Sequence, residues 1–300
     1  MTLETRRRRI PRPLLVALAV VAGLVLALTV DVVRTGGVGP WLAKRGLPPP
    51  YFPQGERFDV GGRSLYIDCR GQGSPTVVLE AGSGSDSGTW SAVHDTLAGT
   101  TRTCAYDRAG RARSDPRGEH TLADAATDLR ALLDAAGERG PFVVTGHSLG
   151  GAYARVFAAA HRDEVVGVVL VDAFSPDLQA DWVHPLLGSL RAGYDASLDG
   201  LRGHVTRVDA LDWGTSEAQL RAASIEGIPL EVLVAPRYEP RLDEATNEAI
   251  RVAWLDAFES LSPGRLRHTV AWGAGHHVHI DRPDLVVEAV RRLVSAARAG

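Results

Sequence analysis

The sequence has no large excess of charge of either sign, and it contains no internal repeat. Its 33 lysine and arginine residues stand against 36 aspartate and glutamate residues, a formal net charge of -3. A protein that binds nucleic acid through a broad basic surface needs a positive excess, so a partner of that kind is excluded. With 45% hydrophobic and 23% charged residues in 300, the chain can bury a full core and is not disordered.

Cysteine, a common metal ligand, is scarce as well. The chain has only two cysteines. One group of histidines, His276, His277 and His279, follows the pattern His-His-x-His, which is found in metal sites and also in ordinary polar loops. No second cluster of histidines, cysteines or carboxylates at ligand spacing accompanies it. We therefore do not expect a metal site, and the mechanism considered below needs no cofactor.

A long apolar run distinguishes the amino terminus from the rest of the chain. Residues 14–30 contain no charged residue, and five arginines between positions 6 and 12 precede them. A buried helix of a globular domain would show a polar face, and this segment has none. The run predicts a transmembrane anchor within residues 1–33, with the arginines in the cytoplasm and the remainder exported. A cleaved signal peptide is the alternative, but residues 26–29 offer only a poor cleavage site, and the product would be secreted.

Beyond a Pro- and Gly-rich tether at residues 34–56, the pattern alternates between strands and helices up to residue 300. This alternation is typical of an α/β sheet. The rhythm breaks at about residues 175–227, where we predict a helical insertion. The expected strands are 57–60, 64–69, 76–82, 101–107, 142–146, 165–173, 228–234 and 265–272, and the expected helices are 121–137, 150–161, 243–261 and 281–299.

Ser148 lies in the string Gly-His-Ser-Leu-Gly, between a predicted buried strand and a predicted helix. A sharp turn there needs residues without side chains, which Gly146 and Gly150 supply. Such a turn exposes the serine oxygen and places backbone N–H groups of the helix start near it, where they can stabilise an oxyanion. Serine is a poor nucleophile alone, so a base and an acid that orients the base are required.

His276 is the strongest candidate for the base. It follows Gly-Ala-Gly after the last predicted strand, so a parallel sheet would bring it to the same edge as Ser148. The chain order serine, acid, histidine also fits.

Five segments together resemble the α/β-hydrolase superfamily, and within it a branch of exported or membrane-anchored serine hydrolases. The resemblance covers about residues 57–299 and rests on SPTVVLEAGSG, RTCAYDRAGRARSD, VVTGHSLGGAYARVFA, VVGVVLVDA and GAGHHVHIDRPDLVVEAV. It implies a mostly parallel central sheet flanked by helices, a helical cap insertion and a catalytic triad. It does not imply a substrate.

The resemblance also implies further site residues. Ser148 matches the nucleophile, and the backbone N–H groups of Leu149 and Ser83 match the oxyanion donors. The acid has two candidates. The commoner family arrangement places it after the strand at 228–234, where Glu239 is the nearest carboxylate, and a minority arrangement selects Asp172. We favour Asp172, because it lies at a strand end whereas Glu239 lies several residues past one.

Two pairs of residues are expected to stabilise the domain. Cys69 and Cys104 lie on strands that are neighbours in the family's sheet, so the resemblance and the predicted export favour a disulfide. Asp107 and Arg108 are expected to brace the loop beside the site.

The sequence thus predicts a membrane-anchored serine hydrolase that acts outside the cytoplasmic membrane on a small ester-like substrate. An amidase, peptidase or perhydrolase would use the same triad. A membrane-tethered binding module without catalytic activity is the alternative of another class.

Overall fold

The computed structural model describes residues 54–174, 191–236 and 243–300. The predicted anchor, most of the tether, Glu239 and the first part of the insertion lie outside these ranges. Within the described ranges, no helix combines the length and the hydrophobicity needed to cross a bilayer.

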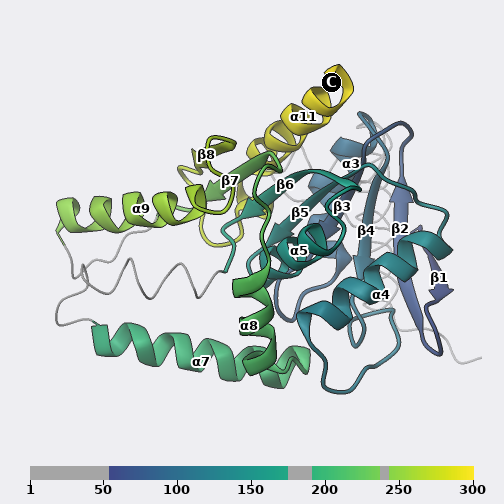
Figure 1. The fold of residues 1–300 in the computed structure, drawn as a ribbon, viewed down its shortest axis with the longest axis horizontal. Helices are drawn as coiled ribbons and strands as arrows, with labels where there is room; N and C mark the ends of the chain where they lie inside the picture. Colours follow the sequence, from purple (N-terminus) through teal and green to yellow (C-terminus); the bar gives the residue numbers. More distant parts are fainter. Residues whose placement is uncertain (1–53, 175–190, 237–242) are drawn as a thin grey trace, which may run out of the picture. The chain divides into compact units, whose positions relative to one another are not determined.

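A sheet of eight strands organises the described residues, in the spatial order β1-β2-β4-β3-β5-β6-β7-β8 (Figure 1). Strands β1 and β2 form the predicted hairpin, and β2 also runs antiparallel to β4. All other neighbouring pairs are parallel. The strands are β1 Glu56–Asp59, β2 Ser64–Arg70, β3 Thr76–Glu80, β4 Thr103–Asp107, β5 Phe142–His147, β6 Val165–Val171, β7 Leu230–Val234 and β8 Leu266–Val270.

Helices cover both faces of this sheet (Figure 1). On one face α4 packs against α5, and on the other α3 packs against α11. The helices are η1 Ser87–Trp90, α3 Ser91–Ala98, α4 Leu122–Ala135, α5 Leu149–Ala160, α7 Arg191–Asp209, α8 Trp213–Ala222, α9 Glu244–Glu259, α10 Val278–Asp281 and α11 Pro283–Ala299. The predicted fold class, a mostly parallel sheet flanked by helices, is confirmed.

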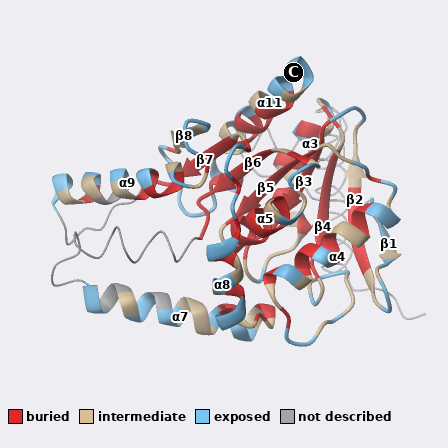
Figure 2. Cartoon of the chain, in the orientation of Figure 1, coloured by how far each residue is buried: buried red, intermediate tan, exposed pale blue. Residues whose placement is uncertain are grey.

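The central strands are buried on both faces, as Figure 2 shows. In β6, Val168 and Leu170 belong to the core that contains α4 and α5, while Val169 and Val171 belong to the core that contains α11. Successive side chains of a strand point to opposite faces, so a strand between two layers of helices must be apolar throughout. This is why residues 165–171 read as one hydrophobic run.

Local signals in the sequence explain several helix ends. Thr121 caps α4 through a capping box with Asp124, and Gly137 follows the helix with a φ of 75°. Pro283 occupies the first turn of α11. Thr121 and Pro283 satisfy or avoid the backbone N–H groups that a helix start leaves unpaired, and Gly137 adopts the left-handed conformation that commonly ends a helix.

Two helices, α7 and α8, form the described part of the insertion. Trp213 of α8 is buried, and its ring lies 5.3 Å from that of Phe174. Trp213 therefore contributes to packing between the insertion and the main core.

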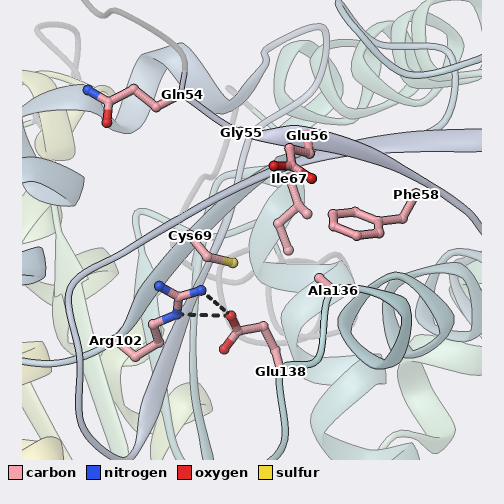
Figure 3. A pocket seen from close by; sticks show the side chains of 9 residues that line it. All are labelled: Gln54, Gly55, Glu56, Phe58, Ile67, Cys69, Arg102, Ala136 and Glu138. Atoms are coloured by element: carbon pink, nitrogen blue, oxygen red, sulfur yellow. Dashed lines mark hydrogen bonds and ion pairs between the residues drawn. The ribbon is translucent and has the colours of Figure 1, made fainter.

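Cys69 and Cys104 lie directly opposite each other on β2 and β4, and they form a disulfide. Cys69 lines a small hollow of about 190 Å³, shown in Figure 3 with the ion pair between Arg102 and Glu138. The hollow lies at the β1-β2 edge of the sheet. None of the predicted catalytic residues lines it.

Candidate active site

Ser148 occupies the sharp turn between β5 and α5. Its backbone has a φ of 52° and a ψ of -123°, a conformation that residues with a side chain rarely adopt. The conformation turns the chain directly from the strand into the helix. At this turn the backbone of three residues lies unusually close to neighbouring atoms.

Each approach requires a glycine. A Cβ atom on Gly146 would overlap the backbone of Gly150, and one on Gly151 would overlap the side chain of Ala173. A Cβ atom on Gly150 would lie 2.6 Å from the carbonyl oxygen of Ala81, at the end of β3. Gly146 and Gly150 thus allow the sharp turn from strand to helix that the sequence predicted, and Gly150 also lets the start of α5 approach the loop after β3.

The structure brings Ser148, His276 and Asp172 together in a chain of hydrogen bonds. The Ser148 hydroxyl lies 3.0 Å from Nε2 of His276, and Nδ1 of His276 lies 2.7 Å from a carboxylate oxygen of Asp172. Because a carboxylate can only accept here, Nδ1 carries the proton and Nε2 accepts from the serine. Each residue follows the carboxyl end of a different parallel strand: β5, β6 or β8. The topology therefore gathers them at one edge of the sheet.

Asp172 is held firmly in this arrangement. Its side chain is 4% exposed and its φ is 41°. The second carboxylate oxygen accepts a hydrogen bond from the backbone N–H of Ala235 at 3.0 Å, and the Asp172 N–H donates to Leu233 at 2.7 Å. Of the two predicted acids, Asp172 contacts His276, and Glu239 lies outside the described residues.

Buried histidines surround the base. Nε2–H of His147 donates to the backbone carbonyl of His276 at 2.9 Å, and the His147 ring lies 4.2 Å from that of His279. Burial lowers the pKa of His147 to about 4 and the pKa of His279 to about 2. Both rings are therefore neutral at physiological pH, and they supply uncharged packing behind His276.

The predicted oxyanion donors flank Ser148. Leu149 is the first residue of α5, where the helix provides no acceptor for a backbone N–H. Ser83 follows Gly82, and a Cβ atom on Gly82 would lie 3.4 Å from Cβ of Ser148. The loop after β3 thus lies against the nucleophile, and Leu149 directly follows Ser148 in the chain.

Arg108 braces the loop after β3, as the sequence predicted. Its guanidinium donates to Glu80 at 2.6 Å, to the carbonyl of Ala81 at 2.5 Å and to the carbonyl of Gly82 at 2.8 Å. Burial is the largest single influence and lowers the pKa of Arg108, but Glu80, Tyr153, Asp209 and Tyr106 together outweigh it, so the pKa is raised. Asp107 braces a second segment by accepting from the N–H groups of Ser87 and Arg113.

The histidine cluster does not form a metal site in the described part of the chain. The one group there with three converging candidate ligands contains Cys69, Cys104 and Glu138. Both cysteines are in the disulfide, so neither provides the thiolate that metals bind.

Sequence reasoning missed two residues close to the site. His147 precedes the nucleophile and was not expected to hold the His276 loop. Asp209, the last residue of α7, contacts Ser83 and Arg108. Its contact with Ser83 joins residues 126 positions apart, and no motif marks it.

Comparisons with known proteins agree with the fold. A family model described as "alpha/beta hydrolase fold" matches residues 75–246. The uncharacterized protein YqjL of Bacillus subtilis is 24% identical over 246 residues, covering 80% of this chain and 92% of YqjL. The solved thermophilic esterase of Thermogutta terrifontis has a TM-score of 0.53 at 22% identity, covering 81% of this chain and 98% of the esterase.

A shorter match concerns part of a much larger protein. The probable transporter efuK of Hormonema carpetanum is 36% identical over 124 residues, or 38% of this chain. The chain spans only 18% of efuK's length. The family model, by contrast, covers more than half of the chain and contains β3 to β7 with the turn at Ser148. The fold and this match establish that the chain belongs to the alpha/beta hydrolase fold family.

Proposed function

We propose that the protein is a serine hydrolase that cleaves carboxylic esters through an acyl-enzyme intermediate. The observation that carries the proposal is the hydrogen-bonded chain from Ser148 through His276 to Asp172, with distances of 3.0 and 2.7 Å. These are hydrogen-bond lengths, and the protonation pattern leaves Nε2 free to take the serine proton. The family assignment supports a hydrolase, and the geometry supports the roles that we propose for Ser148, His276 and Asp172.

The reaction follows from these roles. The Ser148 oxygen attacks the ester carbonyl carbon while its proton moves to Nε2 of His276. The N–H groups of Leu149 and Ser83 bind the negative oxygen of the tetrahedral intermediate, and Asp172 stabilises the imidazolium. The intermediate expels the alcohol, which takes the proton from His276. Water, activated by His276, then attacks the acyl-enzyme and releases the acid and Ser148.

We propose that the substrate carries an apolar group that contacts a hollow near the acid of the triad. A hollow of about 850 Å³ lies beside the ends of β7 and β8. Pro236, Ala245 and Trp272 line it together with the polar and charged residues Asp243, Glu244, Asn247, Glu248 and Arg251. Pro236 directly follows Ala235, whose N–H holds Asp172. Trp272 is 67% exposed, so its large apolar surface is available to a ligand. The exposed Trp272 ring is the feature that supports an ester with an apolar group, and the charged residues on the rest of the hollow leave room for polar groups of the same substrate.

We further propose that residues 14–30 anchor the enzyme in the membrane and that the catalytic domain lies outside the cytoplasm. The charge-free run and the preceding arginines support this topology. The disulfide supports it independently, because disulfides persist in oxidising compartments. Protease added to intact cells, or to cells in which only an outer membrane has been opened, tests this topology. We expect the catalytic domain to be digested while cytoplasmic proteins stay intact. Protection that persists until the cytoplasm is opened would refute it.

The experiment that tests the activity is labelling of the full-length protein, in mild detergent, with a fluorophosphonate probe. We expect labelling of the native protein and none of Ser148→Ala or His276→Ala. His277→Ala is the matched control, since this exposed neighbour contacts neither Ser148 nor Asp172 through a hydrogen bond within the described residues. It should label like the native protein.

The outcome decides between the hydrolase and the binding module. Labelling that requires both Ser148 and His276 establishes an activated serine. Hydrolysis rates on matched p-nitrophenyl esters, anilides and peracids then separate the esterase from the other acyl-transfer reactions. A correctly folded native protein that neither labels nor hydrolyses any of them would favour the binding module.

A further inference from the structure

We propose that Arg108 is a positioning residue for the oxyanion donor of Ser83, and that Asp209 of the cap insertion holds both of them in place. The proposal rests on the proposed function and extends it. It makes the docked end of α7 a determinant of catalytic rate, although no residue of α7 belongs to the triad.

The position of Arg108 is fixed from several sides. Its side chain is 5% exposed and lies over the ring of Tyr153, 4.5 Å from the ring centre. One terminal nitrogen donates to Glu80 and to the Ala81 carbonyl. The other donates to the Gly82 carbonyl at 2.8 Å and lies 3.4 Å from Asp209. A planar guanidinium with these partners has little freedom to rotate.

The hydrogen bond to Gly82 determines where the Ser83 N–H points. Gly82 C=O and Ser83 N–H belong to one peptide unit, which is planar. That peptide is trans, because the cis bonds of the described residues are Ser74-Pro75 and Gly140-Pro141. In a trans unit the C=O and N–H point in opposite directions. Arg108 therefore directs the Ser83 N–H away from itself by holding the carbonyl.

Asp209 joins this arrangement to the cap. Its carboxylate, 2% exposed, accepts from the Ser83 hydroxyl and from the Gly84 N–H at 3.3 Å. It also faces two cations, Arg108 and Arg111, the latter at 3.7 Å. Asp209 thus holds Ser83 and Gly84, on the C-terminal side of the donor peptide, while Arg108 holds the Gly82 carbonyl, and Asp209 also balances part of the buried positive charge.

The chain around Asp209 is itself well anchored. Arg111 donates to the Val208 carbonyl, and His120 N–H donates to the Ala210 carbonyl at 3.0 Å. Asp212 N–H in turn donates to the His120 carbonyl at 2.8 Å. The junction between α7 and α8 is therefore attached to the main domain where Asp209 meets the oxyanion loop, so the carboxylate is a fixed support for it.

The test compares Asp209→Asn and Arg108→Lys with the native full-length protein in ester hydrolysis. We expect kcat to fall tenfold to a hundredfold with KM changed less than threefold, since only the transition state carries the negative oxygen. Affinity for a boronic acid, which mimics that state, should fall in parallel with kcat/KM. The matched control is Asp199→Asn, because Asp199 lies on the same helix in an exposed pair with Arg202. It should change neither quantity.

A second readout does not depend on turnover. Amide hydrogen exchange of the segment around Ser83 should be faster in Asp209→Asn and Arg108→Lys than in native protein or Asp199→Asn. If Asp209→Asn fails to fold, Ser83→Ala replaces it, since this variant removes the hydroxyl bond to Asp209 and keeps the N–H. Ser83→Ala should accelerate exchange and lower kcat at least threefold.

The proposal would be overturned if folded Asp209→Asn and Arg108→Lys had the kcat, the boronic acid affinity or the amide hydrogen exchange of the native protein. An inactive native protein whose exchange still responds to Asp209→Asn would instead refute the proposed hydrolase function. The support of the oxyanion loop by the cap would then stand without its catalytic consequence. The two failures are thereby distinguished.

Discussion

Two residues of the site, Ser148 and Asp172, have positive φ angles of 52° and 41° although neither is glycine. Such a conformation costs about 1 to 3 kcal/mol and persists only where the surroundings impose it. Ser148 lies between closely approaching backbones, and Asp172 has hydrogen bonds to residues at the end of β7. The unfavourable backbone conformations of Ser148 and Asp172 therefore set the directions of their side chains toward His276.

The strain at Ser148 can be measured. We expect the free energy of unfolding of Ser148→Gly to exceed that of Ser148→Ala by about 1 kcal/mol. Only glycine adopts this backbone conformation without an energetic penalty. Urea unfolding of both inactive variants measures the difference. At Ser91, in helix α3, the same pair of substitutions should show the reverse order, since alanine favours helices. Equal stability of the Ser148 pair would disprove the strain.

Asp172 provides a second prediction for a single residue. Asp172→Asn should lower kcat by a factor on the order of 10³ to 10⁴, because an amide no longer selects the Nδ1–H form of His276 or stabilises its imidazolium. Steady-state kinetics measure this factor, and circular dichroism confirms that the variant folds. Full activity of a folded Asp172→Asn would exclude Asp172 as the acid and return attention to Glu239.

Among the elements, the junction of β5 and α5 has the tightest packing at the site. Gly150→Ala should lower the free energy of unfolding by about 3 kcal/mol, because a Cβ would overlap the carbonyls of Glu80 and Ala81. It should also reduce activity by separating Leu149 from the loop after β3. Thermal unfolding and ester hydrolysis test both effects.

Gly200, on α7, provides the control for this substitution. A Cβ at Gly200 meets nothing within 4 Å, so Gly200→Ala should be neutral or stabilising by up to about 1 kcal/mol. A Gly150→Ala variant as stable and active as Gly200→Ala would show that the close approach is not required.

The sequence allowed the elements of the sheet to be predicted well, for physical reasons. Strands such as β6 are apolar throughout because they are covered on both faces, and turn residues bound them. Helix α3 was missed, since Ser91–Ala98 begins without a side-chain cap. The interaction of Asp209 with Ser83 was missed because it depends on tertiary packing alone. The choice between Asp172 and Glu239 stayed open because both follow strands.

For the molecule as a whole, the buried histidines make stability depend on pH. In the unfolded chain, His147 and His279 bind protons below about pH 6.5. In the folded protein their pKa values are about 4 and about 2, so they bind protons only at lower pH. The unfolded state therefore holds more protons between about pH 6.5 and 4, and stability falls as the pH falls. Burial lowers the pKa of His94 and His120 in the same direction.

Removing one of these imidazoles should reduce this loss. Between pH 7 and 4.5, His279→Phe should lose about 2 kcal/mol less stability than the native protein. Urea unfolding at half-unit pH intervals measures both curves. Above pH 7.5, where the histidines are neutral in both states, the difference between the two proteins should be constant. Parallel curves down to pH 4.5 would show that His279 does not contribute.

The disulfide has a mechanical consequence. Strands β1 and β2 precede the family match, which begins at residue 75, and Cys69 ties β2 covalently to β4 inside it. A force applied to the chain at residue 54 would first peel away β1 and then most of β2. Unravelling would stop at Cys69, where the load passes through a covalent bond into the central sheet. The enzyme could therefore lose its amino-terminal hairpin under tension while the edge that carries Ser148, Asp172 and His276 keeps its shape.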